Sequence, residues 1–481
     1  MRRGPELMPA TDTKAFSLGA VGAPLILLAA AGASLTSSQD PLLGPDDFYI
    51  VHVPDTQNYF ASGLQVWPDM MWHIQSFDPP PAYLTHVGDF TQHAAPIEFQ
   101  YGQLSMSVLG DHIPWGVSIG NHDYDDLAWP RDASSWTNAG MGPLSFVNVF
   151  ETPQGPMAAI HLEYSPPDAS LAVAKEFLDA NPAMPALLTL HHNINTQAER
   201  SRDDTDRLGD GPNDSEDVWQ KLVQTYPQIV LIASGHSQGV ARRRDTTVLG
   251  RDVEQHLFNT QGDPLGGNGW TRIYAYAGSR LWIVSFSPSY AGNGTDRSEF
   301  YGVPYDLQAV RHELATTPIT RLAPTQDSFV MPCWGGGSVR GNWQLLWAAE
   351  GGCDEHGLIQ FDTSDLPSAR KAILTVTCEG YSTDGAGFSI HRMLRPWAEM
   401  DSWNSLGGLV AGVDYETLPV ASVGAHGYET LNIDVTPTVQ HWTAHPDSNY
   451  GFVLRGKGET SGFRTREWQA ETERPRLTVV H

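Results

Sequence analysis

The sequence has few positive charges and, beyond its N-terminal part, no long hydrophobic run. Its 29 Lys and Arg stand against 55 Asp and Glu, which gives a formal net charge of −26 at pH 7. Such a surface repels phosphate backbones, so a nucleic-acid duplex is not expected as a partner. Without a long apolar run, no stable membrane span is expected in the mature protein. The length of 481 residues predicts two or three globular domains.

Cysteine is also scarce, and Cys333, Cys353 and Cys378 all lie in the last third of the chain. In an oxidising compartment three cysteines allow one disulfide and leave one thiol over. Cys333 and Cys353 are the favoured pair because both lie in glycine-rich, loop-like sequence. Cys378 interrupts the strand-like AILTVTC and is expected to be a buried structural residue.

Residues 1–33 have the layout of a secretory signal peptide. Arg2, Arg3 and Lys14 precede the apolar stretch FSLGAVGAPLILLAAAGASL, which includes the small-residue sequence Ala31-Gly32-Ala33. This order of positive, apolar and small-residue segments predicts a secreted protein, either extracellular or periplasmic. The alternative is an uncleaved membrane anchor. In either case residues 1–33 are not expected to be part of the globular fold.

The rest of the sequence divides into two regions with different hydrophobic patterns. Residues 45–315 alternate short apolar strands with amphipathic helices, expected near 170–182 and 215–227, which predicts an α/β domain. Residues 316–328 are rich in Thr and Pro and are expected to be a linker. Residues 329–481 show short alternating strands, many turn signals and no helical pattern, so an all-β sandwich is predicted.

Polar residues able to bind a metal follow five apolar strands of the first domain. In α/β sheets, ligands gather outside the carboxyl ends of the strands. One such ending is ordinary, because Asp and Asn favour strand-to-turn junctions, but five in order indicate a site. The strand ends carry Asp55 and Gln57, then Asp89, then Asn121, His122 and Asp123, then His191 and His192, and finally His236 and Gln238.

These strand ends, read as DTQ, GD, GNHD, HH and GHSQ, resemble the signature of the calcineurin-like metallophosphoesterases. The resemblance runs from Asp55 to the strand near residue 285, and the DTQ start with GDPLGGNGWTRIYAY is similar to one branch of that family. It implies a four-layer α/β/β/α sandwich with two divalent metal ions. It also implies hydrolysis of a phosphomonoester or phosphodiester by attack of a metal-bound hydroxide.

The resemblance assigns a metal-binding role to seven residues. Asp89 is the expected bridge, since the two oxygens of one carboxylate can bind two cations at once while offsetting their charge. The other implied ligands are Asp55, Gln57 and Gln238 at the first metal and Asn121, His191 and His236 at the second.

The same resemblance implies the catalytic roles. His122 would donate a proton to the leaving group or stabilise its charge, and Asp123 would orient the His122 imidazole. His191 matches the ligand position better than its neighbour His192, although the reverse order is left open, because adjacent strand residues face opposite ways. His93 could line the substrate cleft, whereas His52 and His86 are expected to be packed or solvated.

Two glutamines depart from the common pattern, since many relatives have histidine at the positions of Gln57 and Gln238. An amide oxygen is a harder and weaker donor than imidazole. The candidate ions are manganese, magnesium, calcium, iron and zinc, and the swaps shift preference from zinc toward manganese, magnesium or calcium. We therefore expect a tightly held ion at the second site and a labile ion at the Asp55/Gln57/Gln238 site.

The C-terminal residues 329–481 resemble a β-sandwich family called DNRLRE-domain or carbohydrate-binding-module-like, through pieces such as LIQFDTSDLPS, DVTPTVQHW and NYGFVLRG. The resemblance implies binding to a polysaccharide or cell-surface glycan. Four tryptophans could stack on sugars, although core packing is the preferred interpretation for most of them. They are Trp397, Trp403, Trp442 and Trp468.

The sequence thus predicts a secreted metal-dependent phosphoesterase that acts on a phosphoester substrate and carries a glycan- or surface-binding domain. The alternative is a weakly active or inactive scaffold whose main role is glycan binding. The intact GNHD favours the enzyme, and the two glutamines favour the scaffold. The acidic segment 199–217 is expected to be a solvated connection, with a lid or calcium-binding loop as a minor alternative.

Overall fold

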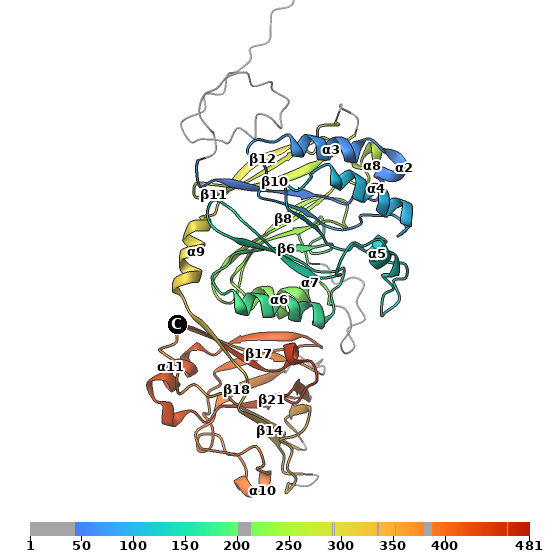
Figure 1. Cartoon of the computed structure of the whole chain (residues 1–481). Coiled ribbons are helices and arrows are strands. Elements are labelled where there is room, and N and C mark those ends of the chain that lie inside the picture. The colour runs from blue at the N-terminus through green and yellow to red at the C-terminus, as the bar shows by residue number, and fades with distance from the viewer. Residues whose placement is uncertain are drawn as a thin grey trace, which may run out of the picture.

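The computed structural model describes residues 44–200, 213–290, 292, 294–333, 336–351, 353–379, 387–458 and 460–481. The predicted signal peptide and most of the acidic segment lie outside these ranges. Two units follow one another along the chain, with helix α9 (Leu307–Thr316) running along the side of the first unit toward the second (Figure 1). Within the described ranges no helix is long and apolar enough to cross a membrane.

The first unit is built on two sheets that face each other. In one, with the order β12-β11-β10-β1-β2-β3, the strands β1, β2 and β3 are parallel. In the other, with the order β4-β5-β6-β7-β9-β8, β5, β6, β7 and β9 are parallel. The first sheet comprises β1 (Phe48–Val53), β2 (Tyr83–His86), β3 (Trp115–Val117), β10 (Thr271–Ala277), β11 (Arg280–Phe286) and β12 (Glu299–Pro304). The second comprises β4 (Phe146–Phe150), β5 (Met157–His161), β6 (Ala186–Leu190), β7 (Ile229–Ser234), β8 (Gly239–Thr246) and β9 (Asp252–Asn259).

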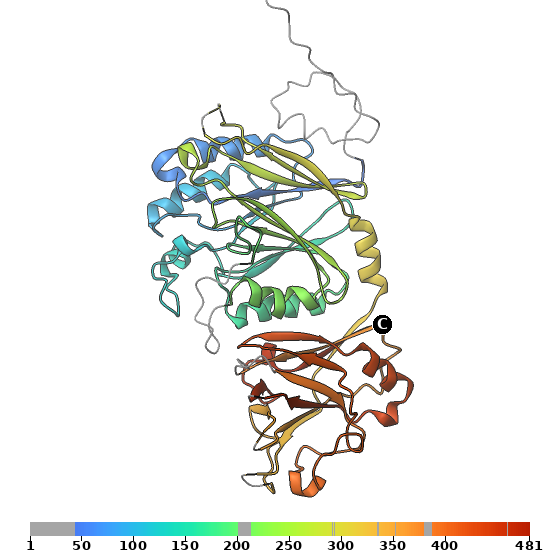
Figure 2. The same cartoon turned by 180° about the vertical axis from the view of Figure 1, so that it is seen from behind.

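Helices cover the outer faces of both sheets, which gives the four layers expected from the resemblance (Figures 1 and 2). Apolar side chains of α3 and α4 pack on the first sheet, and those of α6 and α7 pack on the second. A third apolar core fills the space between the sheets. The helices of this unit are α2 (Tyr59–Ser62), α3 (Val66–Gln75), α4 (Pro96–Ser107), α5 (Ser134–Asn138), α6 (Asp168–Ala180), α7 (Ser215–Lys221) and α8 (Pro264–Gly267).

Helix α7 begins at the predicted residue Ser215 but is shorter than the predicted 215–227. Its cap is Asp214, whose side chain accepts from the backbone N–H of Asp217 at 2.8 Å. The helix ends at Lys221 and is followed by the 3₁₀ turn Val223–Thr225. A carboxylate at the cap satisfies an otherwise unpaired N–H of the first turn.

The second unit contains two main antiparallel sheets, with the orders β13-β23-β17-β20 and β14-β16-β21-β18-β19, and the pair β15-β22. Their facing side chains share one apolar core. Two features differ from expectation: the segment predicted as a linker contains β13, and helix α11 (Thr436–Ala444) buries Val439 and Trp442. The strands are β13 (Ile319–Leu322), β14 (Gln326–Val330), β15 (Leu345–Ala348), β16 (His356–Gln360), β17 (Lys371–Thr377), β18 (Phe388–Arg392), β19 (Ala421–Val423), β20 (Thr430–Asp434), β21 (Phe452–Gly456), β22 (Ser461–Arg464) and β23 (Arg476–Val480), with the short helix α10 (Trp403–Leu406).

The cysteines behave as predicted. Cys333 and Cys353 form a disulfide with a Cα–Cα distance of 5.8 Å. Cys378 is free and buried. The disulfide therefore ties together two loops of the second unit.

The two units meet through charged residues of α6 and α7. The Lys221 ammonium lies 2.9 Å from Asp168 of its own unit and 3.3 Å from Glu473 of the second unit. Arg321, on β13, pairs with Asp179 of α6 at 2.9 Å. These partners fix one face of the first unit against the second.

Candidate metal centre

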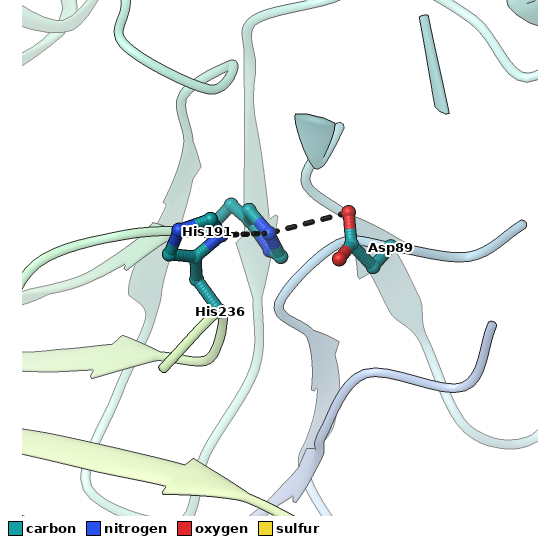
Figure 3. Close-up of side chains that lie close together, drawn as sticks. All are labelled: Asp89, His191 and His236. Carbon is teal, nitrogen blue, oxygen red and sulfur yellow. Dashed lines mark hydrogen bonds and ion pairs between the residues drawn. The ribbon is translucent and has the colours of Figure 1, made fainter. Parts of the chain in front are cut away.

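The predicted ligands come from strand ends that the topology brings to one edge of the molecule. Asp89 follows β2, His191 follows β6 and His236 follows β7. One ligand atom from each of these three residues lies within 4.8 Å of the others, and His191 lies between Asp89 and His236 (Figure 3). Asn121 joins them, because its Oδ1 is 3.0 Å from His191 Nε2 and 2.9 Å from His236 Nδ1. The four implied ligands of the second metal, with Asp89 as the bridge, are thus together.

The hydrogen bonding of His191 shows what this cluster lacks. His191 Nδ1 lies 3.0 Å from the main-chain oxygen of Val87, which only accepts, so Nδ1 carries a hydrogen. In the neutral ring Nε2 is then an acceptor. It faces Asp89 Oδ1 at 3.2 Å and His236 Nδ1 at 3.2 Å, in addition to the Asn121 oxygen. The Asn121 oxygen, the Asp89 carboxylate and the two ring nitrogens thus converge on one point, which a proton on either ring nitrogen or a cation can occupy.

The electrostatics of the isolated chain favour the proton. Burial alone would lower the pKa of His191, but the charge of Asp89 and its hydrogen bond raise the pKa to about 9. Burial opposes ionisation of Asp89, yet His191 lowers the pKa of Asp89 below its ordinary value. A divalent cation would take over the role of this proton, because metal ligands must be deprotonated.

Asp55 is held beside the same edge by close backbone packing. Its carboxylate accepts from the backbone N–H of His236 at 3.0 Å and from the side chain of Asn259 at 2.8 Å. Burial raises the pKa of Asp55 to about 8. A Cβ on Gly235 would lie 1.9 Å from Asp55 Oδ1, so the Gly of the GHSQ motif is required for this approach. A buried carboxylate with few donors is suited to a cation.

Asp89 is fixed by the GNHD motif. Its backbone has φ of 49°, a left-handed conformation that is rare for a non-glycine residue. The backbone N–H of His122 donates to Asp89 Oδ1 at 3.0 Å. A Cβ on Gly120 would lie 2.2 Å from the Asp89 nitrogen, so this glycine lets the two loops meet.

The expected partnership of Asp123 with the His122 ring is wrong. The carboxylate of Asp123 is buried and accepts from the backbone N–H groups of Phe90, Thr91 and Gly120 at 2.7–3.1 Å. Burial raises the pKa of Asp123 to about 7. The His122 ring instead contacts Gln92, with Nδ1 at 3.0 Å from its main-chain oxygen and 3.1 Å from its side-chain nitrogen. Asp123 therefore braces the loop that carries Asp89.

The two glutamines differ in environment. Gln57 is buried, and its Oε1 has no hydrogen-bond partner in the part of the chain that the structure describes. Gln238 is exposed, and its amide lies directly over Gly262, where a Cβ would be 2.1 Å away. A buried amide oxygen without a donor is costly unless a cation or water satisfies it, so Gln57 fits a metal ligand.

The other histidines near these strand ends differ in burial and in their position relative to the cluster. His192 is half-buried, and its ring centroid lies 4.3 Å from that of His236, so it flanks the cluster rather than facing away from it. His52 and His86 are fully buried, and His86 contacts Thr56 Oγ1 at 2.9 Å. His93 is exposed. His191 is the member of the HH pair that contacts Asp89.

Sequence reasoning missed three residues of the site: Gln92, Tyr164 and Asn259. Asn259 ends β9, so the strand-end rule that found the other ligands could have included it. Tyr164 packs its ring on His191 and His236, with centroid distances of 5.7 and 5.6 Å. No local motif marks an aromatic wall or a main-chain carbonyl as functional.

The donor set fits divalent cations. Carboxylate, amide and imidazole groups suit manganese, magnesium, iron or zinc, and Gln57 Oε1 is a buried atom that a cation would satisfy. Residues 48–239 match the family model described as calcineurin-like phosphoesterase. This part of the chain is thus similar to a calcineurin-like phosphoesterase domain. Members of this family bind divalent metals and hydrolyse phosphoesters, and Asp89, His191 and His236 form a candidate metal site of the domain.

Similar proteins match only parts of the chain. The uncharacterized protein YvnB of Bacillus subtilis is 24% identical over 295 residues, which are 55% of this chain and 22% of that protein. A purple acid phosphatase from yellow lupin (Lupinus luteus) is similar in structure, with a TM-score of 0.33 and 11% identity over 55% of each chain. Vacuolar Protein Sorting 29 from Cryptosporidium parvum gives a TM-score of 0.29 and 10% identity over 54% of this chain and 98% of its own.

Proposed function

We propose that this protein is a secreted metal-dependent phosphoesterase that hydrolyses a phosphomonoester or phosphodiester. The observation that carries the proposal is that Asp89, Asn121, His191 and His236 bring four potential metal-ligand atoms to one point. A proton on a ring nitrogen satisfies this network in the isolated chain, and a divalent cation would replace it, because carboxylate, amide and imidazole groups are the ligand types that such cations take.

The residues have distinct tasks in such a reaction. Bound divalent ions would polarise the phosphoryl group and make water a better nucleophile at neutral pH. Asp55 and Asp89 would supply the negative charge that holds the ions. Because His122 Nδ1 is bound to the Gln92 carbonyl, Nε2 is the nitrogen free to hold or deliver a proton at the leaving oxygen.

We propose further that the second unit attaches the enzyme to a polysaccharide or cell-surface glycan. Two of the four tryptophans considered, Trp397 and Trp442, are buried in the core, and Trp403 and Trp468 are half-buried. Trp343, which the sequence did not single out, is 51% exposed and supports the proposal as a flat ring open to stacking.

Turnover after metal reconstitution tests the catalytic proposal. Metal-stripped full-length protein would be assayed on p-nitrophenyl phosphate and bis(p-nitrophenyl) phosphate, with manganese, magnesium, calcium, iron or zinc restored in turn. We expect turnover with at least one ion and its loss in Asn121→Ala at unchanged folding. The matched control is Asn148→Ala, an amide substitution on β4.

The alternative is a weakly active or inactive scaffold whose main role is glycan binding through the second unit. The exposed position of Gln238 over Gly262 favours a weak first metal site and thus this alternative. Absence of turnover with every ion, in protein whose circular dichroism is native, would select it.

A further inference from the structure

A cationic side chain lies close to the metal centre without an acidic partner. Arg131 follows the GNHD motif in the loop before α5 and is half-buried. Its Nη1 donates to the main-chain oxygens of Tyr164 at 2.6 Å and Ser165 at 3.3 Å. Among the described residues no carboxylate lies within 4.0 Å of its guanidinium nitrogens. Acidic residues outnumber basic ones in this chain, 55 to 29, and yet the Arg131 guanidinium pairs with no carboxylate of the described residues. Its positive charge can therefore bind an anion from outside the chain.

Aromatic rings hold the guanidinium in place. Its Cζ lies 4.8 Å from the ring centroid of Tyr164 and 5.5 Å from those of Tyr124 and Trp129. Because Nη1 donates to the two main-chain oxygens and Nε is buried, Nη2 is the nitrogen of the planar group left to donate. Nε of Arg131 is buried and has no hydrogen-bond partner. The arginine is thus oriented by its surroundings without being neutralised by them.

Tyr164 connects Arg131 to the ligand cluster. The same ring that lies under the guanidinium contacts His191 and His236, at centroid distances of 5.7 and 5.6 Å. One aromatic ring therefore separates the arginine from two ligands of the candidate metal site. The described hydrogen bonds to Asp55, Asp89 and Asn121 come from backbone N–H groups, Asn259 and histidines, and none comes from Lys or Arg. Arg131 is the cation that the ring contacts place beside this cluster.

We infer that Arg131 binds the phosphoryl oxygens of the substrate and makes phosphomonoesters the preferred substrate class. A guanidinium N–H forms a charge-assisted hydrogen bond with a phosphate oxygen. A monoester carries more negative charge than a diester, so an extra cation next to the metal ions stabilises a bound monoester more. The inference deepens the proposed phosphoesterase function and rests on it for the substrate preference.

Arg131→Met tests the inference, with Arg311→Met as the matched control. Arg311, on α9, is also half-buried and also donates to two main-chain oxygens, those of Gly155 and Pro156 at 2.9 and 2.8 Å. Titration calorimetry would measure the affinity of the metal-loaded, full-length protein for inorganic phosphate. Kinetics would compare kcat/KM for p-nitrophenyl phosphate and bis(p-nitrophenyl) phosphate.

We expect Arg131→Met to weaken phosphate binding about tenfold or more and to lower the monoester-to-diester ratio of kcat/KM by a similar factor. Arg131→Lys, which keeps the charge but not the fork of donors, should recover part of both. Equal phosphate affinity and an equal ratio in the Met variants of Arg131 and Arg311 would overturn the inference, as would a wild type that binds no phosphate. A wild type that binds phosphate through Arg131 but turns over neither ester would refute the proposed function and leave this anion site standing.

Discussion

The main-chain oxygen of Gln92 lies 3.0 Å from Nδ1 of His122, and the Gln92 side-chain nitrogen lies 3.1 Å from the same atom. Because a carbonyl oxygen only accepts, Nδ1 carries a hydrogen, and the side-chain amide contributes by packing or by presenting its oxygen instead. The orientation of the His122 ring thus comes from the backbone of the loop after β2. A backbone contact survives side-chain substitution.

Gln92→Ala should therefore lower kcat only a few-fold, while His122→Asn removes the proton donor and should lower kcat by about 10²–10⁴. Steady-state rates on the better chromogenic ester, with folding followed by circular dichroism, measure both. If Gln92→Ala lowered kcat as much as His122→Asn does, the side-chain contact rather than the carbonyl would orient the His122 ring.

Asp123→Asn should lower the free energy of unfolding of the first unit and should also lower kcat. Its carboxylate accepts from the N–H groups of Phe90, Thr91 and Gly120, and an amide would turn a donor toward at least one of them. An unsatisfied buried donor costs about 1–3 kcal/mol. Urea unfolding measures this cost, with Asp125→Asn as the control, because Asp125 is exposed and accepts from Ser135. Equal stability of the two variants would contradict the bracing role of Asp123.

Gly235→Ala should abolish metal binding at the Asp55 site. The added Cβ would lie 1.9 Å from Asp55 Oδ1, so the carboxylate has to leave its position. Gly337→Ala is the control, since the atom nearest to its Cβ is the Asn404 side-chain nitrogen at 3.5 Å. Metal content after dialysis against manganese measures the loss. Full retention in the alanine variant of Gly235 would place the metal away from Asp55.

Gln57→His should slow the release of the labile ion. An imidazole nitrogen replaces a weaker amide oxygen that has no hydrogen-bond partner at present. We expect brief chelation to strip one ion from the wild type while the histidine variant retains it, most clearly with zinc. Gln65→His, an exposed position whose amide donates to Asp69, is the control and should behave as the wild type.

Burial lowers the pKa of the His161 imidazole to about 3, although the ring lies within hydrogen-bond distance of Tyr83 and Ser118. The folded chain therefore keeps His161 neutral, whereas the unfolded chain takes up a proton below its ordinary value of 6.5. The unfolded state binds more protons in this interval, so the stabilisation is fully present above pH 6.5 and falls toward pH 3. The loss is about 1.4 kcal/mol per pH unit.

Denaturant unfolding at neutral and mildly acidic pH measures this slope. His161→Gln should show a shallower loss of stability on acidification than the wild type, by about that amount per unit. His312→Gln, at an exposed position of α9, should leave the slope unchanged. Parallel curves for the wild type and the glutamine variant of His161 would show that this ring is not the source.

The strand-end pattern predicted that Asp89, His191 and His236 lie together, because parallel strands place their carboxyl ends at one edge of a sheet. It could not predict the role of Asp123, since Asn121–Asp123 form a 3₁₀ turn that sends neighbouring side chains in different directions. It also missed β13, whose partner β23 lies far along the chain. Helix α11 was not predicted because its nine residues include Pro and several β-branched residues, which disfavour a helix. Its helical conformation depends on burying Val439 and Trp442 in the core of the second unit.

β13 begins just after α9, pairs along its length with β23, and sends Arg321 back to Asp179 and to the main-chain oxygen of Thr225. The connection between the two units is thus a built-in strand rather than a tether. This strand and the Arg321 contacts hold the second unit in one orientation against α6, so the strand ends that carry Asp89, His191 and His236 keep a fixed orientation relative to the second unit.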